Sequence, residues 1–202
     1  MKQISLIEAG KRFNKDWVFQ SLNVDFEQGQ YYALIGNNGS GKSTLLQVIA
    51  GFTNLSKGTI EWANADSQTI YDQISIAAPY LELVEELTTL EHFEFHAKFK
   101  SIINTLSIKE MIQLIGLENS THKQIRYFSS GMKQRLKLAL AIFSNAPILL
   151  LDEPCSNLDK EGYALYKQLI QQYALHKLII VGSNDPEEYA FCTQQINLME
   201  YK

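Results

Sequence analysis

The sequence predicts an α/β fold, in which the strands of a mostly parallel sheet alternate with helices. Short apolar runs rich in β-branched and aromatic residues are separated by stretches with helical spacing. Two of these runs, 148–151 and 178–181, are apolar without alternation, as expected for parallel strands that are covered on both faces. The remaining elements follow from their local patterns.

The expected elements follow one another along the chain. Apolar residues of the first thirty positions lie in short, partly alternating stretches, which predict antiparallel strands or hairpins. The region 88–126 has helical spacing and no obvious strand, so it predicts a separate small lobe. We expect the other strands at 31–35, 74–78, 148–151 and 178–181, and helices at 43–50, 108–115, 131–143 and 160–174.

Composition excludes several classes of protein. The 202 residues are 46% hydrophobic and 20% charged, which is ordinary for one compact globular domain and not for a disordered or disulfide-rich chain. The net charge of -4 gives no reason to expect a nucleic-acid partner. No apolar run is long enough to span a membrane. The two cysteines lack metal-site spacing, and we expect reduced thiols in a cytosolic protein.

The strongest motif is the segment 36–43, GNNGSGKS, which matches G-x-x-x-x-G-K-[ST] between a predicted strand and a predicted helix. Its glycines let backbone N–H groups approach phosphate oxygens, and the helix N-terminus favours the same anion. We expect Lys42 to reach the β- and γ-phosphates of a bound nucleotide and Ser43 to bind Mg²⁺. The predicted nucleotide-binding residues are Gly36, Asn37, Asn38, Gly39, Ser40, Gly41, Lys42, Ser43 and Thr44.

A second motif is the apolar run 148–151, which ends in the two carboxylates Asp152 and Glu153. Ligands of open α/β sheets gather at the carboxyl ends of strands, so both carboxylates should face the phosphate loop. We expect Asp152 to hold Mg²⁺ and contact the nucleotide site, and Glu153 to act as the general base on the attacking water.

Residues 128–135, FSSGMKQR, resemble the LSGGQ-x-x-R signature of ATP-binding cassette (ABC) proteins, and they lie just before the acidic strand as in that family. Residues 156–159, SNLD, resemble its D-loop. The resemblance implies a P-loop NTPase core with an antiparallel β-subdomain over 1–87 and 136–202, and an inserted helical subdomain over about 88–135. It also implies head-to-tail dimers in which Ser129, Ser130 and Gly131 contact the ATP of the partner.

The chain differs from the family at three places. Tyr80 stands where the family usually has a glutamine, and Asn184 stands where it has its switch histidine. The signature carries Ser130 in place of a glycine and Met132 in place of a glutamine, which together are a mild change. For adenine stacking, Phe13 matches the family's aromatic position, with Trp17 as the alternative. Tyr80 and Asn184 remain candidate catalytic residues, and their identities predict slow or altered hydrolysis, because removing one transition-state donor costs about a hundredfold in rate.

Two further clusters have a plain interpretation. His92, Glu94 and His96 are expected to be exposed polar residues of the helical lobe rather than a metal site, because structural zinc takes four ligands. The acidic run Glu82, Glu85 and Glu86 is expected to be a solvated loop, with contact to a membrane partner as the alternative.

The function implied by the resemblance is that of the ATP-binding and ATP-hydrolysing subunit of an ABC transporter. Such a subunit requires ATP and Mg²⁺, a second cassette in a homodimer or heterodimer, and a separate integral membrane permease. It would be cytoplasmic and peripheral to the membrane through that permease. The alternatives are an ABC ATPase outside transport that acts as an ATP-gated switch, and a degenerate cassette that binds ATP but hydrolyses it slowly. A neighbouring gene with about six apolar spans would favour transport.

Overall fold

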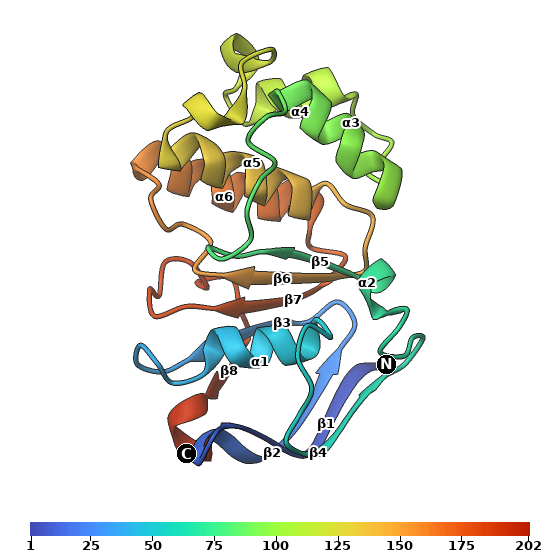
Figure 1. Cartoon of the computed structure of the whole chain (residues 1–202), viewed down its shortest axis with the longest axis vertical. Coiled ribbons are helices and arrows are strands. Elements are labelled where there is room, and N and C mark those ends of the chain that lie inside the picture. The colour runs from blue at the N-terminus through green and yellow to red at the C-terminus, as the bar shows by residue number, and fades with distance from the viewer. The chain divides into compact units, whose positions relative to one another are not determined.

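The computed structural model of the chain describes all residues from 1 to 202 and comprises two compact units (Figure 1). Unit 1 consists of Met1–Ile76, Pro147–Glu153 and His176–Lys202, and unit 2 consists of Ala77–Ala146 and Pro154–Leu175. Both termini therefore belong to unit 1. None of the helices combines the length and the apolar character that crossing a membrane requires.

An antiparallel sheet of three strands forms one part of unit 1. Its order is β2-β1-β4, with β1 at Lys2–Phe13, β2 at Asp16–Glu27 and β4 at Lys57–Trp62. β1 and β2 form a hairpin that closes with Phe13 opposite Asp16, and Asn14 in its tight turn has a left-handed φ of 55°. The antiparallel pairing expected for the first thirty residues is thus confirmed, whereas β4 was not expected.

A sheet of five strands forms the other part, in the order β5-β6-β7-β3-β8. β3 runs parallel to β7 and to β8, and β6 runs parallel to β7. Every residue of β6 and of β7 is buried, which confirms the covered parallel strands expected from their unbroken apolar runs. The strands are β3 at Tyr31–Ile35, β5 at Ile74–Ala77, β6 at Ile148–Asp152, β7 at Leu178–Gly182 and β8 at Gln194–Asn197.

The core of unit 1 lies between the two sheets and helix α1, Lys42–Ile49, which packs against β6 and β7 (Figure 1). Alternate residues of β3, β6 and β7, among them Leu34, Leu150 and Ile180, point into this core and are fully buried. The carboxyl ends of these three adjacent strands meet at one edge of the sheet, where ligands of such sheets bind. The short α2, Ile70–Gln73, and the 3₁₀ helix η3, Leu198–Tyr201, complete the unit.

Unit 2 is helical. α3 packs against α4 and α5, and α5 packs against α6. Capping boxes begin α3 and α4, where Thr88 and Ser107 each exchange hydrogen bonds with a glutamate three residues later. Short 3₁₀ helices, η1 at Glu118–Ser120 and η2 at Ile125–Tyr127, precede α5. The helices are α3 at Thr89–Phe99, α4 at Ile108–Leu114, α5 at Ser130–Ile142 and α6 at Lys160–Tyr173.

The division between the units differs from the predicted boundary. The predicted helical subdomain, 88–135, falls within unit 2, but unit 2 also contains the second half of α5 and all of α6. A cut at position 135 would cross the continuous helix α5, and α6 packs on that helix. The compact unit is therefore larger than the predicted lobe, and the division into subdomains of distinct function stays a prediction.

Candidate functional site

The loop between β3 and α1 is held in a conformation that requires glycine. Gly36, Gly39 and Gly41 all have positive φ, at 142°, 76° and 106°. A Cβ atom on Gly36 would lie 2.8 Å from the Ser40 hydroxyl oxygen, and one on Gly41 would lie 2.5 Å from a methyl group of Val18. At Gly36 and Gly41 the loop backbone therefore packs closer to its neighbours than a side chain would allow.

The N-terminus of α1 is left open at this loop. Its N-cap is Gly41, and no side chain accepts a hydrogen bond from the first turn. The Ser40 hydroxyl is buried and also lacks a partner. Because the first N–H groups of a helix have no partner within the helix, this end carries unmatched donors and partial positive charge. Such an arrangement is suited to a phosphate group.

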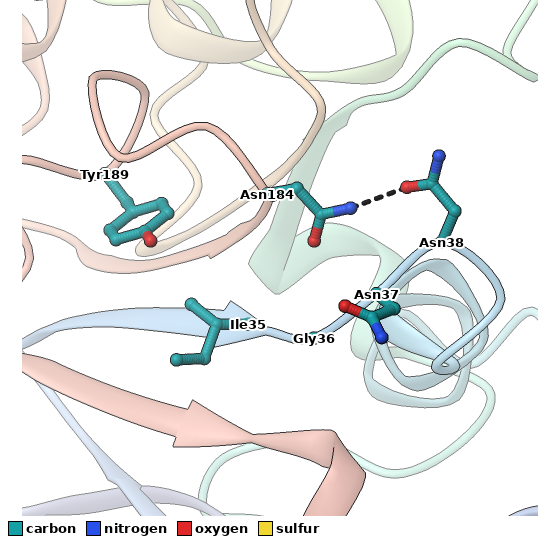
Figure 2. A pocket seen from close by; sticks show the side chains of 6 residues that line it. All are labelled: Ile35, Gly36, Asn37, Asn38, Asn184 and Tyr189. Atoms are coloured by element: carbon teal, nitrogen blue, oxygen red, sulfur yellow. Dashed lines mark hydrogen bonds between the residues drawn. The ribbon is translucent and has the colours of Figure 1, made fainter.

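The ammonium group of Lys42 lies among loop carbonyls and the side chain of Asn184. Its Nζ donates to Gly36 O at 2.7 Å, to Asn37 O at 3.4 Å and to Asn184 Oδ1 at 2.8 Å. Asn184 Nδ2 in turn donates to Asn38 Oδ1 at 2.5 Å, the dashed line in Figure 2. Burial lowers the pKa of Lys42, and the nearby carboxylates act in the opposite direction. Asn184, which follows β7, is therefore part of the phosphate loop's hydrogen-bond network.

Asp152 is the last residue of β6, and its side chain suits a cation. The residue is 1% exposed, and neither carboxylate oxygen has a well-formed hydrogen bond. Burial raises the pKa of Asp152 to about 6, and the neighbouring Ser43 hydroxyl acts against that shift. A buried carboxylate without partners is costly unless a positive charge meets it. The pair of oxygen ligands from Ser43 and Asp152 thus fits the hard cation Mg²⁺.

Glu153 follows directly and lies in a different environment from Asp152. Its side chain is exposed, and its backbone has a left-handed φ of 43°, unusual for a residue other than glycine. Its N–H donates to Gly182 O at 2.9 Å, which fixes the residue to the end of β7. This turn separates the two carboxylates: Asp152 is enclosed, whereas Glu153 remains open to water and lines a cavity with the phosphate loop.

That cavity, about 290 Å³ in volume, connects the phosphate loop to the tip of the β1–β2 hairpin. Phe13 lines it and is 53% exposed. Trp17 does not line it, and its ring lies against Gly10 and below the guanidinium of Arg12. Between the two aromatic candidates left open by the sequence, the geometry favours Phe13. The remaining lining residues are Val18, Asn38, Gly39, Ser40, Gly41, Lys42, Ser43, Thr44 and Glu153.

The predicted signature residues lie in unit 2, at the start of α5. Ser129 is the N-cap, and its hydroxyl oxygen accepts the N–H of Met132 at 3.2 Å. Ser130 is exposed in the first turn, and a Cβ atom on Gly131 would lie 3.2 Å from Asn157 O. The helix is tied to the segment after the acidic strand, because Gln134 Nε2 donates to Pro154 O at 2.6 Å.

Two other predicted features also lie in unit 2. Tyr80 is 40% exposed in the segment between β5 and α3, where Lys137 Nζ donates to Pro79 O at 3.1 Å. The expectation of exposed histidines is wrong for His92, which is buried and accepts the N–H of Val84 through Nε2. The pattern misled because α3 turns the His92 side of the helix inward, and burial likewise lowers the pKa of His96 to about 4.

Three residues near the loop escaped the sequence analysis. Gly182 ends β7, and a Cβ there would lie 3.3 Å from Asp152 Oδ1 and 3.4 Å from the Cβ of Lys42, so its small size makes room for both. Val18 packs beneath Gly41, and Tyr189 lines a second hollow of about 600 Å³ beside Asn37, Asn38 and Asn184 (Figure 2). A glycine directly after a buried strand was the one available signal.

Comparison with known proteins identifies the family. Residues 19–156 match the family model described as "ABC transporter". The chain is 32% identical over 192 residues to the uncharacterized ABC transporter ATP-binding protein YybJ of Bacillus subtilis, covering 92% of this chain and 87% of that protein. It is 28% identical to the cytochrome c biogenesis ATP-binding export protein CcmA of Haemophilus influenzae, covering 92% and 90% of the two chains.

Solved structures share the fold. A putative ABC transporter ATP-binding protein from Pyrococcus furiosus superposes with a TM-score of 0.83 at 19% identity, over 99% of both chains. The dimeric ATP-binding cassette MJ0796, in a post-hydrolysis state with ADP and Pi, gives 0.82 at 22% identity over 96% of this chain and 93% of that one. With its phosphate loop, acidic strand end and family match, the chain belongs to the ABC transporter family, as one of its ATP-binding proteins.

Proposed function

We propose that the chain hydrolyses ATP with Mg²⁺ and acts as one of two ATP-binding subunits that drive a separate membrane permease. The observation that carries this proposal is the meeting of an uncapped helix N-terminus, a buried Lys42 and the two unlike carboxylates at the carboxyl end of β6. The first two groups bind phosphates, and the carboxylates supply a cation ligand and a base.

Lys42 and the open N–H groups of α1 would bind the β- and γ-phosphates. Ser43 and Asp152 would hold Mg²⁺, which neutralises charge on the phosphate oxygens when bound. The buried oxygens of Asp152, which make no well-formed hydrogen bond, support this assignment, because Mg²⁺ would place positive charge beside a carboxylate that burial disfavours. The loop residues 36–44 and Phe13 would complete the nucleotide site, with the adenine base on the aromatic ring.

Glu153 would polarise the water that attacks the γ-phosphate. Its side chain is open to the cavity while its backbone is fixed by the hydrogen bond to Gly182 O. A general base requires this combination of access to water and a held position. The reaction takes ATP and water to ADP and phosphate, with the water proton passing to the carboxylate as the phosphoryl group is transferred.

Hydrolysis is proposed to be slow. Asn184 stands at the switch position, but its amide is already engaged with Lys42 and Asn38. Tyr80 offers a phenol where an amide carbonyl would bind Mg²⁺ and water. Since loss of one preorganised donor costs about 10²–10³ in rate, two altered positions support a low kcat.

The partners follow from the family. In a head-to-tail dimer, Ser129, Ser130 and Gly131 of one copy would face the γ-phosphate bound by the other, where the α5 N-terminus favours the anion. We propose a homodimer, since one chain carries both halves of the site. A permease would bring the subunit to the cytoplasmic face of the membrane. The relative SrtF of Streptococcus pyogenes, 27% identical over 86% of this chain, is a lantibiotic transport ATP-binding protein.

The test is steady-state hydrolysis by the purified chain with Mg²⁺, beside the variant Glu153→Gln. We expect slow turnover in the wild type, loss of about a hundredfold or more in the variant, and stable ATP-bound dimers of the variant. Glu161→Gln makes the same charge change at an exposed position of α6 and should leave turnover unaltered. ATP binding with turnover that is the same in the wild type and in Glu153→Gln would overturn the assignment of the base.

A further inference from the structure

Phe13 lacks an anchor of its own at the place where we propose that it binds adenine. It ends β1 at the tip of the hairpin, beside the tight turn at Asn14, and half of its surface is exposed. A tyrosine there could be fixed by a hydrogen bond through its hydroxyl, but a phenylalanine ring has no polar handle. Something else must hold the ring if it is to bind a base in one orientation.

Lys11 lies two residues earlier on the same strand and contacts the ring. Its Nζ is 5.1 Å from the centroid of Phe13, within cation–π range. The residue is only 9% exposed, and Nζ also donates to Thr53 Oγ1 at 2.8 Å and to Asn54 O at 2.7 Å. The ammonium group is thus fixed by two hydrogen bonds and presents its remaining charge to the aromatic face.

The anchoring segment is continuous with the phosphate-binding helix. Thr53 and Asn54 follow the end of α1 by a few residues. Phe52, just before them, is still bonded to the helix, because its N–H donates to the carbonyl oxygen of Gln47 in α1. A second link joins the same segments, because Ser56 N donates to Gly10 O at 2.8 Å. Lys11 therefore connects the hairpin tip to the far end of the helix whose N-terminus faces the phosphates.

We propose that Lys11 is a positioning residue for the nucleotide base, an inference that rests on the proposed function. It holds one face of the Phe13 ring, so that the base stacks on the opposite face. The cation also draws π-electron density toward itself, which makes the opposite face less negative and favours stacking with an electron-rich purine. Two of its N–H donors are already committed, so Lys11 contributes to the base and not to the phosphates.

The test compares binding of ATP and of inorganic triphosphate by titration calorimetry with Mg²⁺. Lys11→Met should weaken ATP binding about three- to tenfold, the range of a partly desolvated cation–π contact, and leave triphosphate binding and saturated kcat unchanged. Lys11→Arg keeps charge and donors and should restore most of the affinity. Arg12→Met is the matched control, because it removes the same charge from the neighbouring residue, whose guanidinium lies 5.6 Å from the Trp17 ring.

A double-mutant cycle separates positioning from general stability. In a Phe13→Leu background, Lys11→Met should have no further effect on ATP affinity. A persistent effect in that background, an equal loss for ATP and triphosphate, or unchanged ATP binding in Lys11→Met would each overturn the inference. Should Lys11→Met fold poorly, Thr53→Val removes one anchor while the charge stays, and it should weaken ATP binding by a smaller factor. Loss of ATP binding in Lys42→Met tests the proposed function independently of these results.

Discussion

Two helices begin at motifs of the family, α1 in unit 1 and α5 in unit 2, and their N-termini are built differently. The first turn of α1 follows a left-handed glycine, Gly41, and receives no side-chain cap. The first turn of α5 follows Ser129, whose oxygen accepts the N–H of Met132. One end leaves its donors unmatched, whereas the other satisfies a donor within the chain.

This difference indicates which of the two helix N-termini needs a bound nucleotide to satisfy its N–H donors. A glycine N-cap costs a helix only roughly a few tenths of a kcal/mol relative to serine, so a bound anion at the α1 N-terminus gains mainly from its attraction to the unmatched N–H groups and to Lys42. The α5 terminus has one of its N–H donors satisfied without a ligand. The Ser129 hydroxyl still has its own proton to donate, since its oxygen accepts the cap bond through a lone pair. We infer that α1 supplies most of the ATP affinity and that α5 contributes only when a second copy is present.

The largest effect is expected from Gly41→Ala, which adds a methyl group at the uncapped N-terminus of α1. Gly41→Ala places a Cβ 2.5 Å from Val18 at a left-handed φ, and we expect it to lose ATP binding and about 2–4 kcal/mol of unfolding free energy. Gly39→Ala is the control. The φ of Gly39 is also positive, but no atom lies within 4 Å of the added Cβ. Only the cost of a left-handed backbone, about 1–2 kcal/mol of unfolding free energy, therefore applies. Urea unfolding and ATP titration measure both, and wild-type ATP affinity in Gly41→Ala would contradict the comparison.

The second prediction concerns the charge at α1. ATP at about 100 times its Kd should stabilise the wild type by about 2.7 kcal/mol, which raises its Tm. Lys42→Met should lose most of that rise, because the phosphates lose their buried cation. Lys137→Met, which removes a lysine of α5 that likewise donates to backbone carbonyls, should keep it. Thermal melting measures the rise in Tm that ATP causes. An equal rise in the two variants would show that α1 does not supply most of the ATP affinity.

The third prediction separates two roles of Ser129, as the N-cap of α5 and as a proposed contact of the γ-phosphate bound by the partner. Ser129→Ala should cost about 1 kcal/mol of stability, while Ser129→Asp should keep the cap and the stability. The aspartate nonetheless places a negative charge where the partner's γ-phosphate is proposed to lie. We therefore expect ATP-dependent dimerisation, measured by sedimentation with Glu153→Gln present, to fail in Ser129→Asp while ATP binding by the monomer persists. Dimers of Ser129→Asp as stable as those of Ser129 would argue against a phosphate at this end.

The strands and helices with strong local patterns were predictable from the sequence. β3 has the expected bounds, and β6, β7 and α5 begin or end within one residue of the prediction, because unbroken apolar runs and helical spacing are properties of the segment itself. β8 reads QQIN and has one apolar residue, Ile196, so its pairing with β3 depends on the neighbouring strand rather than on its own pattern. β4, with Gly58 in its interior, was missed for the same reason.

The candidate site likewise has a part that the sequence predicts and a part that depends on the fold. Its loop residues 36–43 form a contiguous motif whose spacing predicts phosphate chemistry, and the structure gives them the expected strand–loop–helix context. The bond between Asn38 and Asn184 joins residues 146 positions apart, and it exists only because β7 lies beside β3 in the sheet. The contact of Lys11 with Thr53 and Asn54 likewise depends on the fold, so no local pattern pointed to it.

The smallest effect is expected at Asn184, which ties the first residue of α1 to the end of β7. Asn184→Ala removes one charge-assisted hydrogen bond from the Lys42 ammonium group. Because Asn184 is exposed, water can replace the lost acceptor, and we expect kcat to fall only about three- to tenfold, in line with a loss of about 1 kcal/mol. Asn184→His tests the acceptor: only a neutral imidazole can accept from Lys42, so turnover should fall as the pH drops through about 6.5. The wild-type amide does not titrate, so its pH–rate profile should lack that step. If the pH–rate profiles of the wild type and of Asn184→His were superimposable, the hydrogen bond from Lys42 to residue 184 would not be needed for turnover at the α1 N-terminus.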